Sequence, residues 1–460
     1  MSRARRFHIV GIGGMGMSAV ARLLMAQGNS VSGSDKGSWP LAEALAADGA
    51  AVATEFAAEN VTGADVVVRS SAYGETNPEV AAAHAAGIPV WKREDAWREL
   101  ARGKRVLAVA GTHGKSTTTA LAWTALRAGG LDPSLICGAV LRDLGTNAYA
   151  GRGDLLVIEA DEYDHAFLSL EPEIAIVTNV EHDHVDVFPT HADVKRAFRH
   201  FAAGIVRGGW LVACADDPGA AELATNRGDD LAGRQVVTYG MASEAGYRVV
   251  ELLQRADGVT FDLTGPFENP VPVSLRLAGA HNARNAAGAL AAADAAGVPA
   301  AAAAKSFATF RGTERRLEEL GAVSGITVVD DYAHHPTEIR ASIEGMRART
   351  TGRVIVLFQP HTPSRLRAFF DDFAAALRTA DASVVAETFS SAREAADSRA
   401  GAKALAASAG AAYVLDAEAA ARELADRARP GDLVLVLGAG DIRPAGVRLL
   451  ELLRERGTAA

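Results

Sequence analysis

The chain has 460 residues, of which 49% are apolar and 22% are charged, and its formal net charge is −9. A single hydrophobic core does not serve a chain of this length, so we expect about three domains. The acidic balance excludes the basic surface of a non-specific nucleic-acid-binding protein, and no apolar run reaches the roughly 18 residues of a membrane helix. Two distant cysteines, Cys137 and Cys214, and no recognisable signal peptide predict a cytoplasmic protein, and nothing in the sequence indicates its oligomeric state.

Strand and helix patterns alternate along the chain, which predicts α/β domains with parallel sheets. The boundaries that we expect give three domains, 1–104, 105–311 and 312–460. Apolar runs predict strands at 6–10, 30–33, 65–68 and 88–90 in the first domain, at 106–110, 154–158, 174–177 and 210–213 in the second, and at 327–329, 354–358 and 433–437 in the third. Residues 235–277 are rich in β-forming residues and turns, and the alanine-rich segment 285–304 keeps a helical period.

A glycine-rich loop, Gly-Ile-Gly-Gly-Met-Gly at 11–16, directly follows the first predicted strand. With Asp35 after the next strand, it matches the fingerprint of a dinucleotide-binding loop. Its mechanics suit any nucleotide diphosphate, because the glycines only let the backbone approach the phosphates. The sequence Arg-Ser-Ser-Ala at 69–72 follows another strand of the same sheet, so we expect its hydroxyl groups at the same edge.

A second loop, Ala-Gly-Thr-His-Gly-Lys-Ser-Thr at 110–117, lies between a predicted strand and a helix that we expect to begin at Thr118. This is the arrangement of a loop that holds a nucleoside triphosphate, although Val109 stands where the usual pattern has glycine. Lys115 would supply a positive charge to the outer phosphates, and the Ser116 hydroxyl would ligate Mg²⁺.

Two clusters of carboxylates and imidazoles follow the strands that we expect beside this loop. They are Glu-Ala-Asp-Glu-Tyr-Asp-His at 159–165 and Thr-Asn-Val-Glu-His-Asp-His at 178–184. Oxygen ligands near phosphates favour Mg²⁺, whereas zinc is disfavoured because thiolates and the usual spacing are missing.

The motifs together resemble those of the ATP-dependent Mur ligases of bacterial cell-wall synthesis. They run in order along nearly the whole chain: HIVGIGGMGMS at 8–18, SSA at 70–72 with NPE at 77–79, AGTHGKST at 110–117, EADEYD at 159–164, TNVEHDH at 178–184, AGAHNARNA at 278–286, DDYAHHPTEI at 330–339, FQPH at 358–361 and GAGDI at 438–442. The motifs at 8–18 and 358–361 favour the members that add L-alanine over the recycling members that add a whole tripeptide.

The resemblance implies the fold and the reaction. It implies an N-terminal Rossmann-like domain for the UDP-sugar, a central domain of the P-loop ATPase type and a C-terminal Rossmann-like domain. The reaction would be the ATP-dependent ligation of L-alanine to the lactyl carboxylate of UDP-N-acetylmuramate through an acyl phosphate, the first peptide step of peptidoglycan precursor synthesis. Glycine or serine as the amino acid stays open.

The resemblance also implies a role for each matching residue. The UDP-sugar would be held by Gly13, Gly14, Met15, Gly16, Ser34, Asp35, Ser70 and Ser71. ATP would be held by Gly111, Thr112, His113, Gly114, Lys115, Ser116, Thr117, Asn282 and Asn285. Ser116 and Glu159 would ligate Mg²⁺, with His184 on a second ion. The amino acid would contact Tyr332, His334, His335 and Arg365, and the catalytic residues would be Lys115, His184, Arg316 and His335. The proton of the amine would go to His184, Asp183 or His335.

The chain departs from the family pattern at four positions. Ser116 replaces a threonine, Glu314 stands where glycine is frequent, and Thr362 stands where an arginine is frequent. Arg199 occupies the position of a lysine that some relatives carry in a carbamylated form, so we do not expect that modification; Lys195 is a weak substitute.

Two alternatives belong to other classes of protein. An NAD-dependent oxidoreductase would account for the first glycine loop and Asp35, but it leaves the second loop and both acidic clusters unexplained. A regulatory module that binds nucleotide without catalysis would have no use for Lys115, Glu159 and His184 together.

Overall fold

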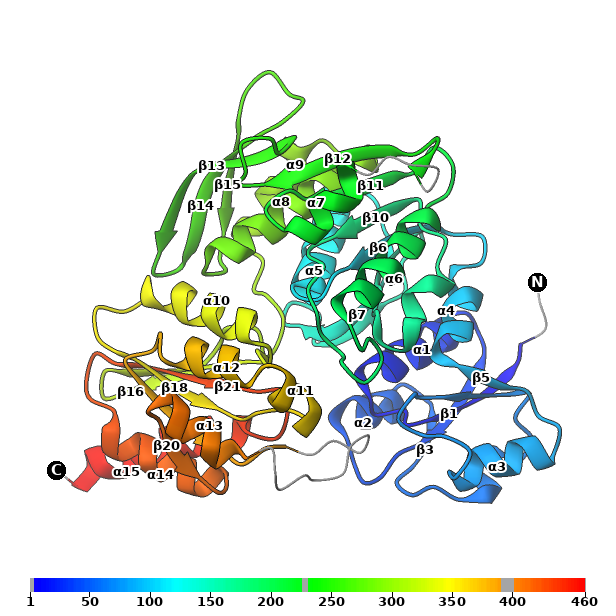
Figure 1. Cartoon of the computed structure of the whole chain (residues 1–460). Coiled ribbons are helices and arrows are strands. Elements are labelled where there is room, and N and C mark those ends of the chain that lie inside the picture. The colour runs from blue at the N-terminus through cyan, green and yellow to red at the C-terminus, as the bar shows by residue number, and fades with distance from the viewer. Residues whose placement is uncertain (1–3, 226–230, 390–400, 460) are drawn as a thin grey trace.

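The computed structural model describes residues 4–225, 231–389 and 401–459. Over these residues the chain forms three sheets in series, each flanked by helices. Figure 1 shows the domain of the second sheet (green) above, with the first (blue) and the third (yellow to red) below it on either side. No helix in these ranges is long and apolar enough to cross a membrane.

The first sheet has five parallel strands in the order β3-β2-β1-β4-β5. Its central strand β1 is buried from Phe7 to Val10 and leads into the first glycine loop, so that loop lies at the carboxyl edge of the sheet. The strands are β1 (Arg6–Val10), β2 (Ser30–Ser34), β3 (Ala51–Ala53), β4 (Val66–Arg69) and β5 (Val90–Lys92), and the helices are α1 (Met15–Ala26), α2 (Pro40–Ala47), the 3₁₀ turn η1 (Ala58–Val61), α3 (Pro78–Ala85) and α4 (Arg93–Ala101).

The second sheet has ten strands in the order β15-β14-β13-β12-β11-β10-β6-β9-β7-β8. The seven strands from β13 to β7 in this order run parallel, and antiparallel strands extend both ends. The strands are β6 (Arg105–Ala110), β7 (Ser134–Leu141), β8 (Thr146–Tyr149), β9 (Leu155–Glu159), β10 (Ile174–Val177), β11 (Trp210–Cys214), β12 (Gln235–Gly240), β13 (Tyr247–Arg255), β14 (Gly258–Thr264) and β15 (Val271–Leu275).

Helices α5 and α8 pack against each other beside this sheet. Helix α8 is buried along most of its length, and Gly288 lets it lie close to β12, because a Cβ there would lie 2.7 Å from the Tyr239 ring. The helices and 3₁₀ turns of this part are α5 (Lys115–Ala128), η2 (Tyr163–Ser169), α6 (His191–Ala203), α7 (Pro218–Thr225), α8 (Ala280–Ala295), α9 (Ala300–Ala304) and η4 (Lys305–Ala308).

The third sheet has six strands in the order β16-β17-β21-β18-β19-β20, of which only β16 is antiparallel to its neighbour among the described residues. The strands are β16 (Glu318–Val323), β17 (Ile326–Asp331), β18 (Val354–Phe358), β19 (Ala382–Ala386), β20 (Ala412–Val414) and β21 (Leu433–Leu437). The helices are α10 (Pro336–Arg347), α11 (Pro363–Ala368), α12 (Phe370–Leu377), α13 (Ala402–Ala409), α14 (Ala417–Arg427) and α15 (Arg443–Ala459).

The segment that enters the third domain is attached to the end of β7. The Arg142 amide donates to the Gly312 carbonyl at 3.1 Å, and the Glu314 amide donates to the Val140 carbonyl at 2.9 Å. Thr313 and Leu141 pair as an antiparallel bridge between these two bonds. The connection is therefore a short strand bonded to the second sheet rather than a free linker.

The α/β architecture with three domains is confirmed, and each predicted strand has a counterpart within a few residues. The segment predicted as one helix at 285–304 is two helices, because Gly297 and Pro299 interrupt it between α8 and α9. Helix α5 begins at Lys115 rather than at Thr118. Strands β3, β7, β8, β16, β19 and β20 were not predicted.

Candidate active site

The loop after β6 requires both of its glycines. Gly111 has φ 141°, and a Cβ there would lie 1.9 Å from Thr178 Oγ1; Gly114 has φ 78°, in the left-handed region. Asn179 holds the loop from the next strand, because its Oδ1 accepts from the His113 amide at 2.8 Å and its Nδ2 donates to the His113 carbonyl at 3.1 Å. The loop is therefore fixed in shape at the start of α5, where a helix favours an anion.

Lys115 is the first residue of α5, and its ammonium group folds back over the loop. It donates to the carbonyls of Gly111 at 2.5 Å and Thr112 at 3.0 Å, and it lies 2.9 Å from Glu162 Oε2. Burial alone would lower the pKa of Lys115, but the carboxylates of Glu162 and Asp161 raise it. The group is therefore charged, and it lies where phosphates would enter.

Ser116 and Glu159 bring two oxygen donors together beside Lys115. Ser116 Oγ donates to Glu159 Oε1 at 3.0 Å, and the Gly138 amide on β7 donates to Glu159 Oε2 at 2.6 Å. A hydroxyl and a carboxylate at this separation form the kind of ligand set that a hard divalent cation takes. The residues present therefore fit Mg²⁺.

His184 has an unusual backbone conformation and contacts the same Glu162 carboxylate as Lys115. Its φ is 49°, and its amide donates to Asp183 Oδ1 at 2.7 Å, which holds the residue in that conformation. His184 Nε2 lies 3.5 Å from Glu162 Oε1. Burial would lower the pKa of His184, but Asp183 and Glu162 raise it.

Asp183 also joins the second domain to the third. Arg365 of α11 binds it through both ends of the guanidinium group, with Nε 2.8 Å from Oδ1 and Nη2 3.3 Å from Oδ2. The two side chains are only 4% and 8% exposed. This ion pair therefore depends on the two domains being in contact.

Two cavities meet at the loop. The larger, of about 590 Å³, extends from Gly16 of the first domain past Lys115 and Glu159 to Tyr332 and Arg365 of the third. The smaller, of about 320 Å³, lies on the other side of the loop. Its walls include Thr117, Asn282, Asn285, Asp216 and Tyr239. His113, Gly114, Arg316 and Glu338 line both cavities.

The predicted residues of the third domain lie mostly on the larger cavity. Tyr332, His334 and Arg365 line it, and the guanidinium of Arg316 lies 5.2 Å from the Tyr332 ring and 3.5 Å from Glu338. The departures Glu314 and Thr362 also line this cavity, so they affect its chemistry directly. Lys195 is instead paired with Glu222 at 2.6 Å.

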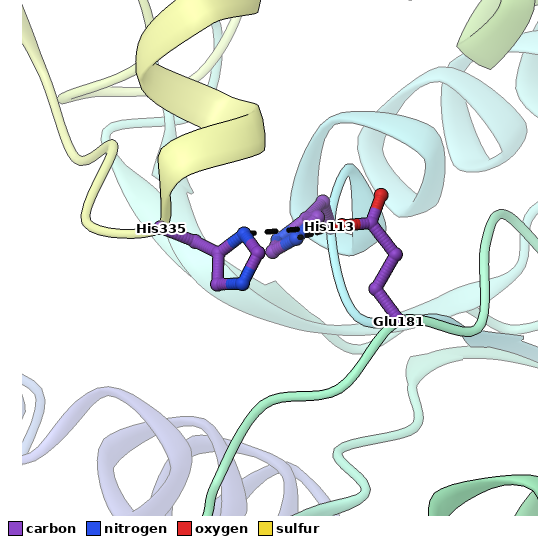
Figure 2. A group of neighbouring side chains, drawn as sticks. All are labelled: His113, Glu181 and His335. Atoms are coloured by element: carbon purple, nitrogen blue, oxygen red, sulfur yellow. Dashed lines mark ion pairs between the residues drawn. The ribbon is translucent and has the colours of Figure 1, made fainter. Parts of the chain in front are cut away.

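His113, Glu181 and His335 form a compact group where the second and third domains meet (Figure 2). One nitrogen or oxygen from each lies within 4.8 Å of the others, which is short enough for a metal site. However, His113 also lies 3.4 Å from Glu338, and although burial would lower its pKa, Glu338 and Glu181 raise it to about 10. His113 is thus paired with a carboxylate from each domain, and the group forms an ionic contact between them.

His335, predicted as a catalytic and amino-acid-binding residue, lies outside both cavities. His335 is 5% exposed and lines neither cavity, whereas the adjacent His334 lines the larger one. His335 is instead the N-cap of α10. Its Nδ1 accepts from the Thr337 amide at 3.3 Å, and its own backbone amide donates to the Glu338 side chain. Of the two adjacent histidines, His334 therefore lines the cavity and His335 caps the helix.

We expect His335→Ala to lower the free energy of unfolding by about 1 kcal/mol, as loss of an N-cap does. His335→Asn should keep most of it, since asparagine caps well. Urea denaturation followed by circular dichroism measures both. A selective rise in the KM for the amino acid at unchanged stability would contradict this assignment and restore the predicted role.

The first glycine loop is hydrogen-bonded to Asp35, the acidic residue that follows the second strand. Asp35 accepts from the Gly13 amide at 3.0 Å and from the Tyr73 hydroxyl at 3.4 Å, and Met15 and Gly16 line the larger cavity. Ser34 is fully buried, its hydroxyl donates to Glu79, and it does not line the larger cavity. Ser70 is half-buried and Ser71 exposed at the same edge, where Ala72 lines the cavity.

Several residues of the site were missed because their partners are distant in sequence. Arg93 of α4 pairs with Asp161 at 2.8 Å, and Asn147 of β8 donates to the Met15 carbonyl at 2.6 Å. Glu162 and Glu338 were inside quoted motifs but received no role. No spacing rule would have found the first two; the last two were detectable as acids beside predicted basic residues.

Models of three Mur ligase domains match the chain in order. The Mur ligase family catalytic domain matches residues 6–105, the Mur ligase middle domain matches 109–293, and the glutamate ligase domain of Mur ligases matches 315–440.

Proteins similar to the whole chain support the same assignment. A UDP-N-acetylmuramate–L-alanine ligase from Renibacterium salmoninarum is 43% identical over 451 residues, covering 97% of this chain and 96% of the relative. The crystal structure of a UDP-N-acetylmuramate–alanine ligase from Thermotoga maritima superimposes with a TM-score of 0.82 at 28% identity, covering 98% of this chain and all of that one. A murein peptide ligase from Psychrobacter arcticus shares the fold, with a TM-score of 0.72 at 24% identity over 98% of this chain and 99% of its own. Because the matches run from one end of the chain to the other at this level of identity, the chain belongs to the Mur ligase family.

Proposed function

We propose that the protein joins L-alanine to the lactyl carboxylate of UDP-N-acetylmuramate at the expense of ATP, the first peptide step of peptidoglycan precursor synthesis. The products are UDP-N-acetylmuramoyl-L-alanine, ADP and phosphate. A carboxylate is a poor acyl donor because oxide is a poor leaving group, and phosphorylation by ATP to an acyl phosphate removes that difficulty. The amine of alanine then displaces phosphate.

One observation supports this function most strongly: the two cavities share the phosphate loop, and all three domains contribute to their walls. We assign ATP to the smaller cavity, where Asn282 and Asn285 lie on α8 beside Gly114. We assign the UDP-sugar and L-alanine to the larger one, between Gly16 and Tyr332. The γ-phosphate would then meet the lactyl carboxylate beside Lys115.

Charge around the transferred phosphoryl group comes from Lys115 and Arg316 in this proposal. Preorganised cations in a water-poor site are among the largest contributors to such a step. Mg²⁺ would be held by Ser116 and Glu159, with His184 on a second ion, and would neutralise charge on the phosphates when bound. Closure of the third domain would exclude the water that would otherwise hydrolyse an acyl phosphate.

The three residues predicted to accept the proton of the amine are all engaged in the structure. His184 lies beside Asp183 and Glu162, which raise its pKa against the effect of burial. Asp183 accepts two bonds from Arg365, which holds its pKa well below the usual value despite its burial. His335 caps α10. The proposal therefore gives these residues positions and no proton-transfer step.

The function is tested by phosphate release from ATP in the presence of UDP-N-acetylmuramate and one acceptor at a time. We expect L-alanine to support turnover, with glycine and serine weaker. Turnover with L-alanyl-D-glutamyl-containing tripeptide and none with L-alanine would instead identify a recycling ligase. No phosphate release with any acceptor would overturn the proposal.

The full-length protein should bind UDP-N-acetylmuramate and ignore NADH. In a dinucleotide-binding domain the acidic residue after the second strand takes a ribose hydroxyl. Here Asp35 is occupied by Gly13 and Tyr73, and the Trp39 side chain lies against Gly13. Titration followed by isothermal calorimetry, with NADH as the matched ligand, measures the preference, and preferential NADH binding would contradict the assignment of this domain.

A further inference from the structure

Glu162 is a buried carboxylate at the centre of the site to which the motifs give no role. It precedes η2, and its side chain is 2% exposed. Its Oε2 lies 2.9 Å and its Oε1 3.1 Å from Lys115 Nζ, and Oε1 lies 3.5 Å from His184 Nε2. One carboxylate therefore holds the two side chains that the proposed reaction directs to phosphate and metal.

The hydrogen bonds of Lys115 leave no donor over for a phosphate. An ammonium group has three N–H donors, and here they face the carbonyls of Gly111 and Thr112 and the carboxylate of Glu162. A phosphate oxygen must replace one of these acceptors. Glu162 is the only one of the three that carries a negative charge, so its exchange for phosphate keeps the charge on Lys115 balanced.

We propose that Glu162 is a positioning residue. Its carboxylate binds both Lys115 and His184 until a nucleoside triphosphate enters. Lys115 then binds the phosphates instead, while Glu162 still orients His184. This inference rests on the proposed assignment of ATP to the phosphate loop. It has two opposite consequences. Glu162 weakens the binding of ATP, because it competes for Lys115 and repels the phosphates, and it speeds turnover, because it orients His184.

Glu162→Gln separates these consequences, since the amide keeps the size of the side chain and removes its charge. Bound ATP is measured in EDTA by displacement of a fluorescent ATP analogue from the full-length protein, so that no metal contributes. We expect ATP to bind about tenfold more tightly, a change of about 1.4 kcal/mol. We also expect kcat with L-alanine and UDP-N-acetylmuramate to fall about a hundredfold, within the range for a lost electrostatic or positioning contact.

Two variants complete the test. Glu162→Asp keeps the charge but shortens its reach, so it should tighten ATP binding less than Glu162→Gln, and it should recover part of kcat. Asp164→Asn removes a neighbouring charge that pairs instead with Lys92 at 3.3 Å, and we expect both quantities to stay at wild-type values.

The possible outcomes distinguish a failure of the role of Glu162 from a failure of the proposed function. Unchanged or weaker ATP binding by Glu162→Gln, or tighter binding without loss of kcat, overturns the role of Glu162. If that variant does not fold, Glu162→Asp decides, because unchanged ATP binding there also overturns it. Failure of the wild-type protein to bind ATP would contradict the proposed function itself.

Discussion

Replacing Lys115 with alanine is expected to abolish ligation while leaving the fold intact. The ammonium group lies over the phosphate loop at the start of α5, and a cation at that place stabilises the charge of the transferred phosphoryl group. Loss of such a charge lowers turnover by about a thousandfold or more. Phosphate release measures the loss, and circular dichroism measures the fold.

Lys195→Ala is the matched control for this variant. Lys195 belongs to the same domain, but it pairs with Glu222 away from both cavities. Turnover should stay near the wild-type value. Retention of phosphate release by Lys115→Ala would show that the loop has been assigned wrongly.

Replacing Arg365 with methionine is expected to lower kcat/KM for all three substrates by about a hundredfold to a thousandfold. Removing one partner of a buried ion pair leaves the other charge uncompensated, which costs about 3–5 kcal/mol. Here the stranded group would be Asp183, which also holds the backbone of His184. The closed arrangement of the second and third domains would be disfavoured by that amount.

Steady-state kinetics with each substrate varied in turn measures this effect. Arg365→Lys should recover little, because an ammonium group cannot make the two-ended contact. Arg367→Met makes the same replacement on an exposed part of the same helix and should leave the kinetics unchanged. A loss confined to the KM for L-alanine would instead indicate that Arg365 binds the amino acid directly, as the resemblance implies.

The sequence predicted the elements whose apolar pattern is strong and local. Strand β6, the loop after it and the acidic clusters beside that loop all follow from contiguous motifs. Strand β16 was missed because it alternates poorly and is interrupted at Gly321, where the register shifts. Strand β7 was missed because Gly138, in its middle, is a poor strand former, although its amide is needed at Glu159.

Long-range pairs set the limit for the site. The sequence placed residues on the correct strand edges, but it could not pair Arg93 with Asp161 or His113 with Glu338, because each pair joins different domains. His334 and His335 illustrate the same limit at short range. In the sequence, either of two adjacent histidines before a proline suits a helix cap or a binding site. Only the packing shows which one faces the cavity.

The hydrogen-bonded connection between the second and third domains couples a movement of the third domain to the second sheet. Gly312, Thr313 and Glu314 are bonded to the end of β7, and the same strand carries the Gly138 amide that holds Glu159. A rotation of the third domain would therefore also displace β7, the strand whose Gly138 amide binds Glu159. Opening of the enzyme would disturb the position of this carboxylate at the same moment that it breaks the contact between Arg365 and Asp183. Hydrogen exchange should accordingly rise and fall in step at 134–141 and 312–314, although the two segments are far apart in the sequence.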